Sequence, residues 1–135
     1  MGSTSQSPTA IFTGQSRVTD FLDRIAAKSA KVGIFGLGYV GIPLALSIVR
    51  CGLPVLGFDI AQERVDQLQA GKSPIRHFAD DEIARIRKDG FEATGDFARA
   101  GECDALIICV PTPLNKYREP DLSFVEATMA SIAPH

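Results

Sequence analysis

A glycine-rich hexapeptide in the first third of the chain constrains the fold more than any other feature of the sequence. Its residues are Gly36-Leu37-Gly38-Tyr39-Val40-Gly41. It follows a short apolar run at 31–35 and opens a second one at 39–51, which is typical of a tight turn from a buried strand into a helix. In that setting Gly36 allows the turn, Gly38 lets the backbone approach a pyrophosphate, and Gly41 lets the helix pack closely on the strand. The first N–H groups of the helix would then be available to phosphates.

A carboxylate follows this turn at the distance that dinucleotide binding requires. Asp59 comes 18 residues after Gly41, directly after a predicted strand at 53–58. A carboxylate there accepts hydrogen bonds from the adenosine ribose and repels a 2′-phosphate, which predicts NAD rather than NADP as the cofactor. Arg64 either favours such a phosphate or lies along the adenine. The alternative without a ligand is an ordinary turn followed by a solvated aspartate.

Predicted strands and helices alternate along the chain. The strands are expected at 31–35, 53–58, 91–94 and 104–110, the last of them buried on both faces. The helices are expected at 18–30, 39–51, 61–70, 79–88 and 123–133, with a helical turn at 97–101. Ser123 is predicted to cap the final helix in a capping box with Glu126. This order predicts an α/β fold with a doubly wound, Rossmann-like parallel sheet that is incomplete at the C-terminus.

A second candidate contact follows the most strand-like run of the chain. Thr112 lies between Pro111 and Pro113, just beyond the end of the fourth predicted strand. Ligands of open α/β sheets bind at the carboxyl ends of the strands where the strand order reverses, here between the first and the fourth strand. The Thr112 hydroxyl would bond a ribose or phosphate oxygen of the cofactor. The alternative is a surface threonine in a proline-fixed loop.

Composition excludes several classes of protein. Fourteen Lys and Arg against 16 Asp and Glu give a net charge of −2 without basic blocks, so no nucleic-acid partner is predicted. No apolar run approaches the roughly 20 residues that a membrane-spanning helix needs. We therefore expect a reduced, cytoplasmic domain at 17–135, preceded by a flexible tail at 1–16 that is rich in Ser, Thr and Gly.

The cysteines and histidines provide no candidate catalytic or metal site. Cys51, Cys103 and Cys109 are scattered, show no metal-ligand spacing, and are interpreted as small buried apolar residues. His77 and His135 have no recognisable partner that would make either a general base. No catalytic residue and no metal ligand is therefore assigned.

Together these motifs resemble the nucleotide-sugar dehydrogenases, also called UDP-sugar 6-dehydrogenases. The resemblance covers residues 31–135. It rests on Gly36-Leu37-Gly38-Tyr39-Val40-Gly41-Ile42-Pro43-Leu44-Ala45, Gly57-Phe58-Asp59 with Arg64, Cys109-Val110-Pro111-Thr112-Pro113 and Arg118-Glu119-Pro120-Asp121-Leu122. Within the family, stretches 73–77 and 110–122 look most like enzymes of UDP-N-acetylhexosamines, the UDP-N-acetylglucosamine 6-dehydrogenases above all. The Glu-Pro-Gly-Leu stretch of the UDP-glucose branch is not found.

The resemblance implies an NAD-dependent, four-electron oxidation of a sugar C6 alcohol to the carboxylate. It assigns the pyrophosphate to Gly36, Gly38, Tyr39, Val40 and Gly41, the adenosine end to Asp59 and Arg64, and the inner ribose to Thr112. The family's cysteine nucleophile, lysine and acid match no residue of this sequence. We therefore expect an N-terminal NAD-binding domain that ends before the central and UDP-sugar-binding domains and binds NAD without turnover. The full-length enzyme would act on a UDP-sugar as a homo-oligomer.

Two other readings remain open at this point. The first is the cofactor domain of another NAD-dependent dehydrogenase, such as a β-hydroxyacid dehydrogenase. Those enzymes typically carry methionine in the glycine turn, so Tyr39 and the Val110-Pro111-Thr112-Pro113 stretch argue against this reading. The second is a stand-alone NAD-binding regulatory module, which fits the short chain.

Overall fold

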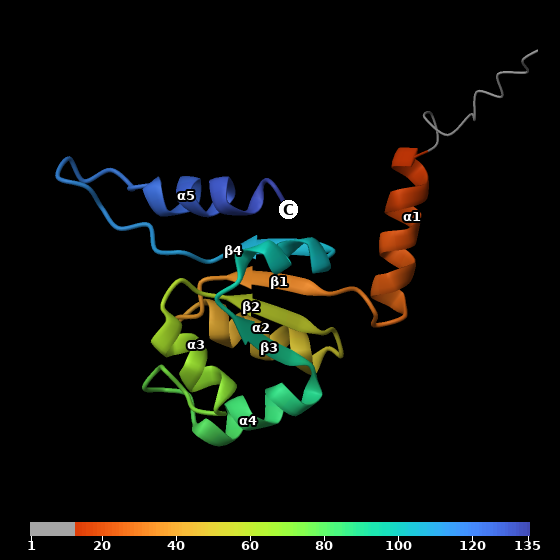
Figure 1. The fold of residues 1–135 in the computed structure, drawn as a ribbon, viewed down its shortest axis with the longest axis horizontal. Helices are drawn as coiled ribbons and strands as arrows, with labels where there is room; N and C mark the ends of the chain where they lie inside the picture. The colour runs from red at the N-terminus through yellow and green to blue at the C-terminus, as the bar shows by residue number, and fades with distance from the viewer. Residues whose placement is uncertain (1–12) are drawn as a thin grey trace, which may run out of the picture.

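A four-stranded parallel sheet organises the molecule (Figure 1). The computed structural model describes residues 13–135; the rest of the predicted tail, 1–12, lies outside the described residues. The strands are β1 (Val32–Phe35), β2 (Val55–Phe58), β3 (Phe91–Thr94) and β4 (Ala105–Ile108), in the order β3-β2-β1-β4. All neighbouring strands are parallel, and Phe35 lies in register with Phe58 and Ile108. This confirms the predicted doubly wound α/β fold.

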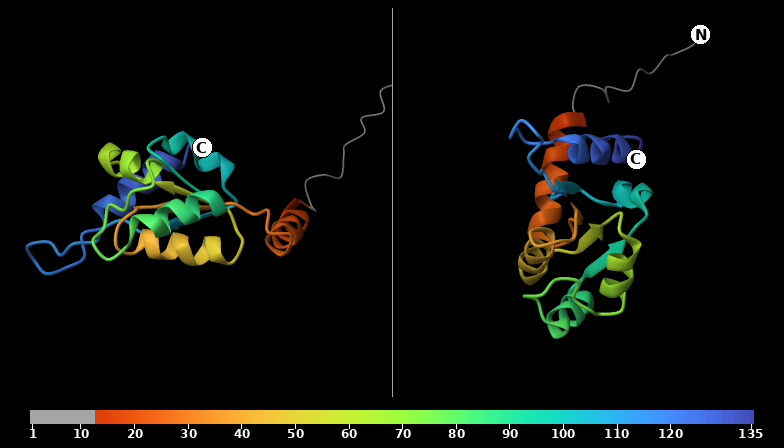
Figure 2. Two further views of the ribbon diagram at one scale, coloured as in Figure 1. Left: turned by 90° about the horizontal axis from the view of Figure 1, so that it is seen from below. Right: turned by 90° about the vertical axis from the view of Figure 1, so that its left-hand side faces the viewer.

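Helices flank both faces of this sheet (Figure 2). They are α2 (Gly41–Arg50), α3 (Gln62–Gln69), α4 (Asp80–Asp89), the 3₁₀ helix η2 (Phe97–Glu102) and α5 (Ser123–Ile132), whereas α1 (Thr13–Ala26) covers neither face. Helices α2, α3 and α4 pack their apolar residues around Ile34 of β1. Phe35, the next residue of β1, points to the other face because strand side chains alternate, and it packs with residues of η2 and α5. Within residues 13–135, no helix is long and apolar enough to cross a membrane.

Two hydrophobic clusters stabilise the two faces. The larger one is built from β1, β2, β3 and the helices α2, α3 and α4. The smaller one is built around Phe35 and Phe58, whose rings stack at 4.3 Å between centroids, with Phe97 edge-on to both. Because Phe35 ends β1 directly before Gly36, the aromatic cluster lies beside the glycine turn.

The first helix differs from its predicted bounds of 18–30. Helix α1 begins at Thr13, within the predicted tail of 1–16, and ends at Ala26. Ser, Thr and Gln lower helix propensity by only a few tenths of a kcal/mol, so one further turn adds little cost once the amphipathic segment is helical. Helix α1 stands apart from the sheet in Figure 1, and an ion pair between Arg24 and Asp104 ties it to the start of β4.

The predicted capping box of α5 is wrong. Ser123 is the first helical residue and not the cap, and no side chain caps at Leu122. The carboxylate of Asp121 instead accepts a hydrogen bond from the Ser123 N–H at 2.9 Å. An aspartate placed before the helix satisfies a free N–H directly, so the sequence contained a competing acceptor two residues earlier.

Two predictions of burial are also wrong. Strand β4 is only half-buried, with Leu106 exposed, because within residues 13–135 it pairs with β1 alone. Cys51 is exposed at the end of α2, since the helix ends at the surface where the chain turns back at Gly52. Cys103 and Cys109 are partly buried, close to their predicted state.

Candidate functional site

The glycine turn links β1 to α2. At two of its positions the backbone leaves no room for a side chain. Gly36 has a φ of +100°, and a Cβ there would come within 2.6 Å of the Cys109 carbonyl oxygen. A Cβ on Gly41 would come within 1.7 Å of the Gly36 carbonyl oxygen. Side chains are therefore excluded at both positions by the chain itself, which agrees with the predicted turn and the predicted helix packing.

Gly38 differs because nothing in the chain fills the space beside it. A Cβ there would meet no atom within 4 Å. Within residues 13–135, the N–H groups of Gly38, Tyr39 and Val40 donate to no other group. Unpaired N–H groups at a helix N-terminus attract anions through their partial positive charge. The turn therefore offers an open, electropositive cradle, and the residues present fit a cofactor pyrophosphate.

Asp59 lies at the end of β2 and is 6% exposed. Its Oδ2 accepts hydrogen bonds from the Leu37 N–H at 2.9 Å and from Arg64 at 3.0 Å, and its Oδ1 accepts one from the Ala61 N–H at 2.8 Å. This carboxylate therefore fixes the glycine turn to β2 and to the start of α3. Two carboxylate oxygens have about four acceptor positions, so one remains for a ribose hydroxyl.

One pocket of about 710 Å³ joins most of the predicted cofactor residues. The pocket lining includes Gly36, Gly38, Tyr39, Val40, Asp59, Arg64 and Thr112. Gly41 is buried behind the turn and does not line the pocket. Thr112 is exposed at the pocket because β4 pairs with β1, which brings the two strand ends together as predicted.

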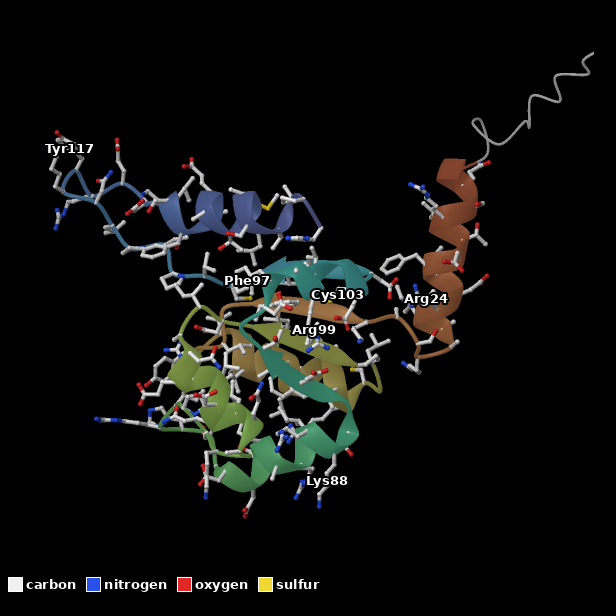
Figure 3. All side chains as sticks on the ribbon, viewed as in Figure 1. Arg24, Lys88, Phe97, Arg99, Cys103 and Tyr117 are labelled. Carbon is white, nitrogen blue, oxygen red and sulfur yellow. The ribbon has the colours of Figure 1, made fainter. Side chains whose placement is uncertain are left out.

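Helix α5 contributes a wall of the pocket that was not predicted from the sequence. Four residues line the pocket from α5, namely Phe124, Ala127, Thr128 and Ser131. Phe97, which is labelled in Figure 3, lines it from η2. The spacing of Phe124, Thr128 and Ser131 at i, i+4 and i+7 places them on one helix face. That spacing was visible in the sequence, but only the packing of α5 on η2 shows which face is turned inward.

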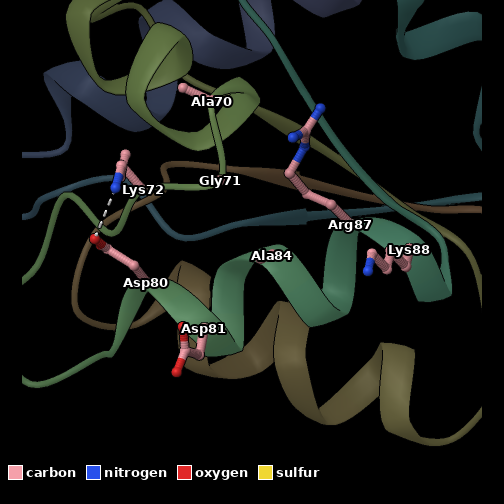
Figure 4. Close-up of a pocket in the computed structure, with 8 residues that line it drawn as sticks. All are labelled: Ala70, Gly71, Lys72, Asp80, Asp81, Ala84, Arg87 and Lys88. Carbon is pink, nitrogen blue, oxygen red and sulfur yellow. Dashed lines mark ion pairs between the residues drawn. The ribbon is translucent and has the colours of Figure 1, made fainter.

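One carboxylate, Asp59, and one thiol, Cys109, line the pocket, and the carboxylate already accepts three hydrogen bonds. Cys109 is its only thiol, and burial raises the pKa of that thiol, which keeps it protonated near neutral pH. A second hollow of about 470 Å³ lies between the end of α3 and α4, where Lys72 and Asp80 form an ion pair (Figure 4). None of the glycine-turn residues lines this hollow. Within the described part of the chain, no cluster of His, Cys, Asp and Glu could hold a metal ion.

Comparison with known proteins places this arrangement in a family. Residues 30–135 match the model of the UDP-glucose/GDP-mannose dehydrogenase family, NAD binding domain. UDP-N-acetyl-D-mannosamine dehydrogenase of Escherichia coli K12 is 38% identical over 109 residues, which are 78% of this chain and 25% of the relative. UDP-N-acetyl-D-glucosamine 6-dehydrogenase of Salmonella typhi is 38% identical over 93 residues, 69% of this chain and 21% of the relative.

A solved structure with a similar fold comes from the same group of dehydrogenases. GDP-mannose dehydrogenase from Pseudomonas aeruginosa superposes with a TM-score of 0.70 at 34% identity, over 75% of this chain and 24% of that one. This chain thus spans about a quarter of the length of the relatives that it matches. The family match covers the glycine turn, Asp59 and Thr112, which are the residues around the pocket. The chain belongs to the UDP-glucose/GDP-mannose dehydrogenase family, of which it represents the NAD-binding domain.

Proposed function

We propose that the chain binds NAD in the pocket at the glycine turn. The pyrophosphate is assigned to the turn residues Gly36, Gly38, Tyr39, Val40 and Gly41, with Gly41 acting through helix packing. The adenosine end is assigned to Asp59 and Arg64, and the inner ribose to Thr112. The observation that supports this most is the open space at Gly38 beside three N–H groups that have no partner within residues 13–135.

Asp59 and Arg64 also bear on the choice between NAD and NADP. The guanidinium of Arg64 lies 3.0 Å from the Asp59 carboxylate, so its charge is already balanced by an aspartate. A 2′-phosphate would have to displace Arg64 from this pair and approach a negative carboxylate. We therefore expect NAD to be preferred, as the sequence predicts.

The substrate proposed for the full-length enzyme is a UDP-sugar, with UDP-N-acetylhexosamines as the favoured class. The names of two of the relatives, which refer to UDP-N-acetyl-D-mannosamine and UDP-N-acetyl-D-glucosamine, support this class. NAD supplies the hydride acceptor, and two molecules of NAD⁺ are consumed for each C6 alcohol that becomes a carboxylate. The family's cysteine nucleophile, lysine and acid match no residue of this sequence, so we propose that this chain alone binds NAD without turnover.

Titration calorimetry of the 135-residue chain with NAD and NADP tests this function directly. We expect saturable NAD binding and NADP binding weaker by about tenfold or more, which is about 1.4 kcal/mol. Absence of NAD binding, or equal affinity for both cofactors, would contradict the proposal. Adding UDP-N-acetylglucosamine with NAD should produce no NADH; steady NADH formation would refute the proposed lack of turnover.

A further inference from the structure

A closed hairpin connects the end of β4 to the start of α5. The chain runs outward from β4 over residues 113–121 and returns to α5 (Figure 1). The Pro113 C=O accepts a hydrogen bond from the Asp121 N–H at 2.7 Å, and Leu114 and Pro120 form an antiparallel bridge. The two legs of this 113–121 hairpin are therefore joined to each other at their root.

The side chain of Asn115 holds the tip of the hairpin together. Its Oδ1 accepts hydrogen bonds from the Tyr117 N–H at 2.8 Å and the Glu119 N–H at 3.0 Å. Its backbone N–H donates to the Glu119 C=O at 2.8 Å, and its C=O accepts from the Arg118 N–H at 2.9 Å. Tyr117 lies at this tip, far from the sheet (Figure 3). Since both partners of Oδ1 are N–H donors, the side chain at this position must present an acceptor.

The root of the hairpin is adjacent to the pocket. Thr112, which lines the pocket, directly precedes Pro113. On the other side of Thr112, the Cys109 N–H donates to the Phe35 C=O at 2.7 Å and fixes the end of β4. Thr112 is thus held between the sheet and the hairpin. Helix α5 has an anchor of its own, since Ile132 is buried and the helix packs on η2.

We propose that Asn115 is a positioning residue for Thr112 in the NAD site. This proposal rests on the proposed binding of NAD, in which Thr112 bonds the inner ribose. Asn115 does not line the pocket, so its role is indirect. It closes the hairpin, and the closed hairpin fixes Pro113 and the Thr112 hydroxyl beside it. When the hairpin opens, affinity falls with the fraction of molecules that keep the hydroxyl in place.

Substitution of Asn115 tests the proposal with ligands that contain or lack the inner ribose. Asn115→Ala should weaken binding of NAD and ADP-ribose by about 3- to 10-fold and leave AMP, which lacks that ribose, within about twofold. Asn115→Asp should bind all three ligands as the unsubstituted chain does, because a carboxylate oxygen accepts the same two N–H groups. Unchanged NAD affinity in Asn115→Ala, or an equal loss for AMP and NAD, would refute the positioning role.

Two further variants of the tip provide a control and an independent disruption. Glu119→Ala is the control, because Glu119 bonds in the hairpin through its backbone N–H and C=O, which alanine retains. Its affinities should stay within about twofold of those of the unsubstituted chain. Arg118→Pro disrupts the tip without changing Asn115, since Arg118 has a φ of +63° and donates its N–H, and proline permits neither. It should reproduce the pattern of Asn115→Ala; normal NAD affinity would contradict the proposal.

A double substitution tests whether the effect passes through Thr112. Thr112→Val replaces the hydroxyl by a methyl group and should itself weaken NAD binding. In that background Asn115→Ala should change NAD affinity by less than about twofold, because the contact that it positions is already gone. A further loss as large as in the unsubstituted chain would show that the hairpin does not act through Thr112.

The two proposals fail in different ways. If the unsubstituted chain binds no NAD, the proposed function is refuted and the positioning role with it. If NAD binds and Thr112→Val weakens it, but folded Asn115→Ala does not, the positioning role alone is refuted.

Discussion

At the scale of single residues, Gly38 and Gly41 have different roles. Gly38 is required for NAD binding, and Gly41 is required for folding. Gly38→Val places a side chain in open space, so the fold and most of the helix content should persist while NAD binding is lost. Gly41→Val should not fold, because its Cβ would lie 1.7 Å from the Gly36 carbonyl oxygen. Circular dichroism and calorimetry on the same samples test both variants. Full NAD affinity in folded Gly38→Val would show that this glycine serves the turn alone.

The carboxylate of Asp59 contributes both to folding and to cofactor binding. Asp59→Ala leaves the Leu37 N–H, the Ala61 N–H and Arg64 without their acceptor, so we expect a loss of about 2–3 kcal/mol in the free energy of unfolding. The preference for NAD over NADP should also narrow. Urea unfolding and binding of both cofactors measure the two effects. Glu63→Ala, an exposed change next to Arg64, is the control and should alter neither.

At the scale of elements, Asp121 stabilises the start of α5 in place of the predicted capping box. The Ser123 N–H donates to the Asp121 carboxylate, and this bond lowers the pKa of that carboxyl below its ordinary value. A folded-state pKa that is depressed adds stability above the unfolded pKa of about 3.9. The stability that Asp121 adds to α5 should therefore be lost as the pH falls from about 3.9 through the lower pKa of the folded state.

Amide hydrogen exchange in α5 measures this effect. Asp121→Ala should reduce the protection of the first turn of α5 near neutral pH. It should also abolish the loss of this protection on acidification. Glu126→Ala should reduce protection less, because the side chain of Glu126 bonds no backbone group of the cap in the structure. A larger effect for Glu126→Ala would mean that the predicted capping box forms in solution after all.

The turn after α1, which ends at Ala26, contains a residue in an unfavourable backbone conformation. Lys28 has a φ of +59°, a region that costs side chains about 1–2 kcal/mol and costs glycine nothing sterically. Glycine loses more backbone entropy on folding, so Lys28→Gly should give a net stabilisation of about 0.5–1 kcal/mol. Urea unfolding measures it. A destabilised Lys28→Gly would indicate that the side chain, which lies near Gly52, contributes packing of its own.

The elements also show what the sequence could and could not predict. The alternation of strands and helices, the turn and the position of Asp59 follow from local patterns, because glycine spacing and apolar runs act over a few residues. The exposure of Leu106 and the contribution of α5 to the pocket do not follow from local patterns. Each depends on which element packs against β4 or α5 in the folded chain. The buried role of Asp59 as an acceptor for Leu37 was likewise not predicted, because it requires two segments 22 residues apart to meet.

At the scale of the whole molecule, the pocket lies where the strand order reverses between β1 and β4. The turn after β1, Asp59 after β2 and Thr112 after β4 all come from the carboxyl ends of parallel strands. Helix α5 then closes the side that the strands leave open. Together with Phe97 of η2, the site is assembled from five separate stretches of chain, so its cofactor affinity should depend on the integrity of the entire sheet.

The same topology leaves β4 with one paired edge within residues 13–135. Unpaired backbone groups beside an exposed apolar side chain, here Leu106 at 42% exposure, favour edge-to-edge association. We expect the molar mass from size-exclusion chromatography with light scattering to rise with the concentration of the 135-residue chain. Leu106→Lys should shift it towards the monomer, whereas Leu122→Lys, which is exposed outside the sheet, should not. A monodisperse monomer at every concentration would show that the β4 edge is protected from pairing in solution.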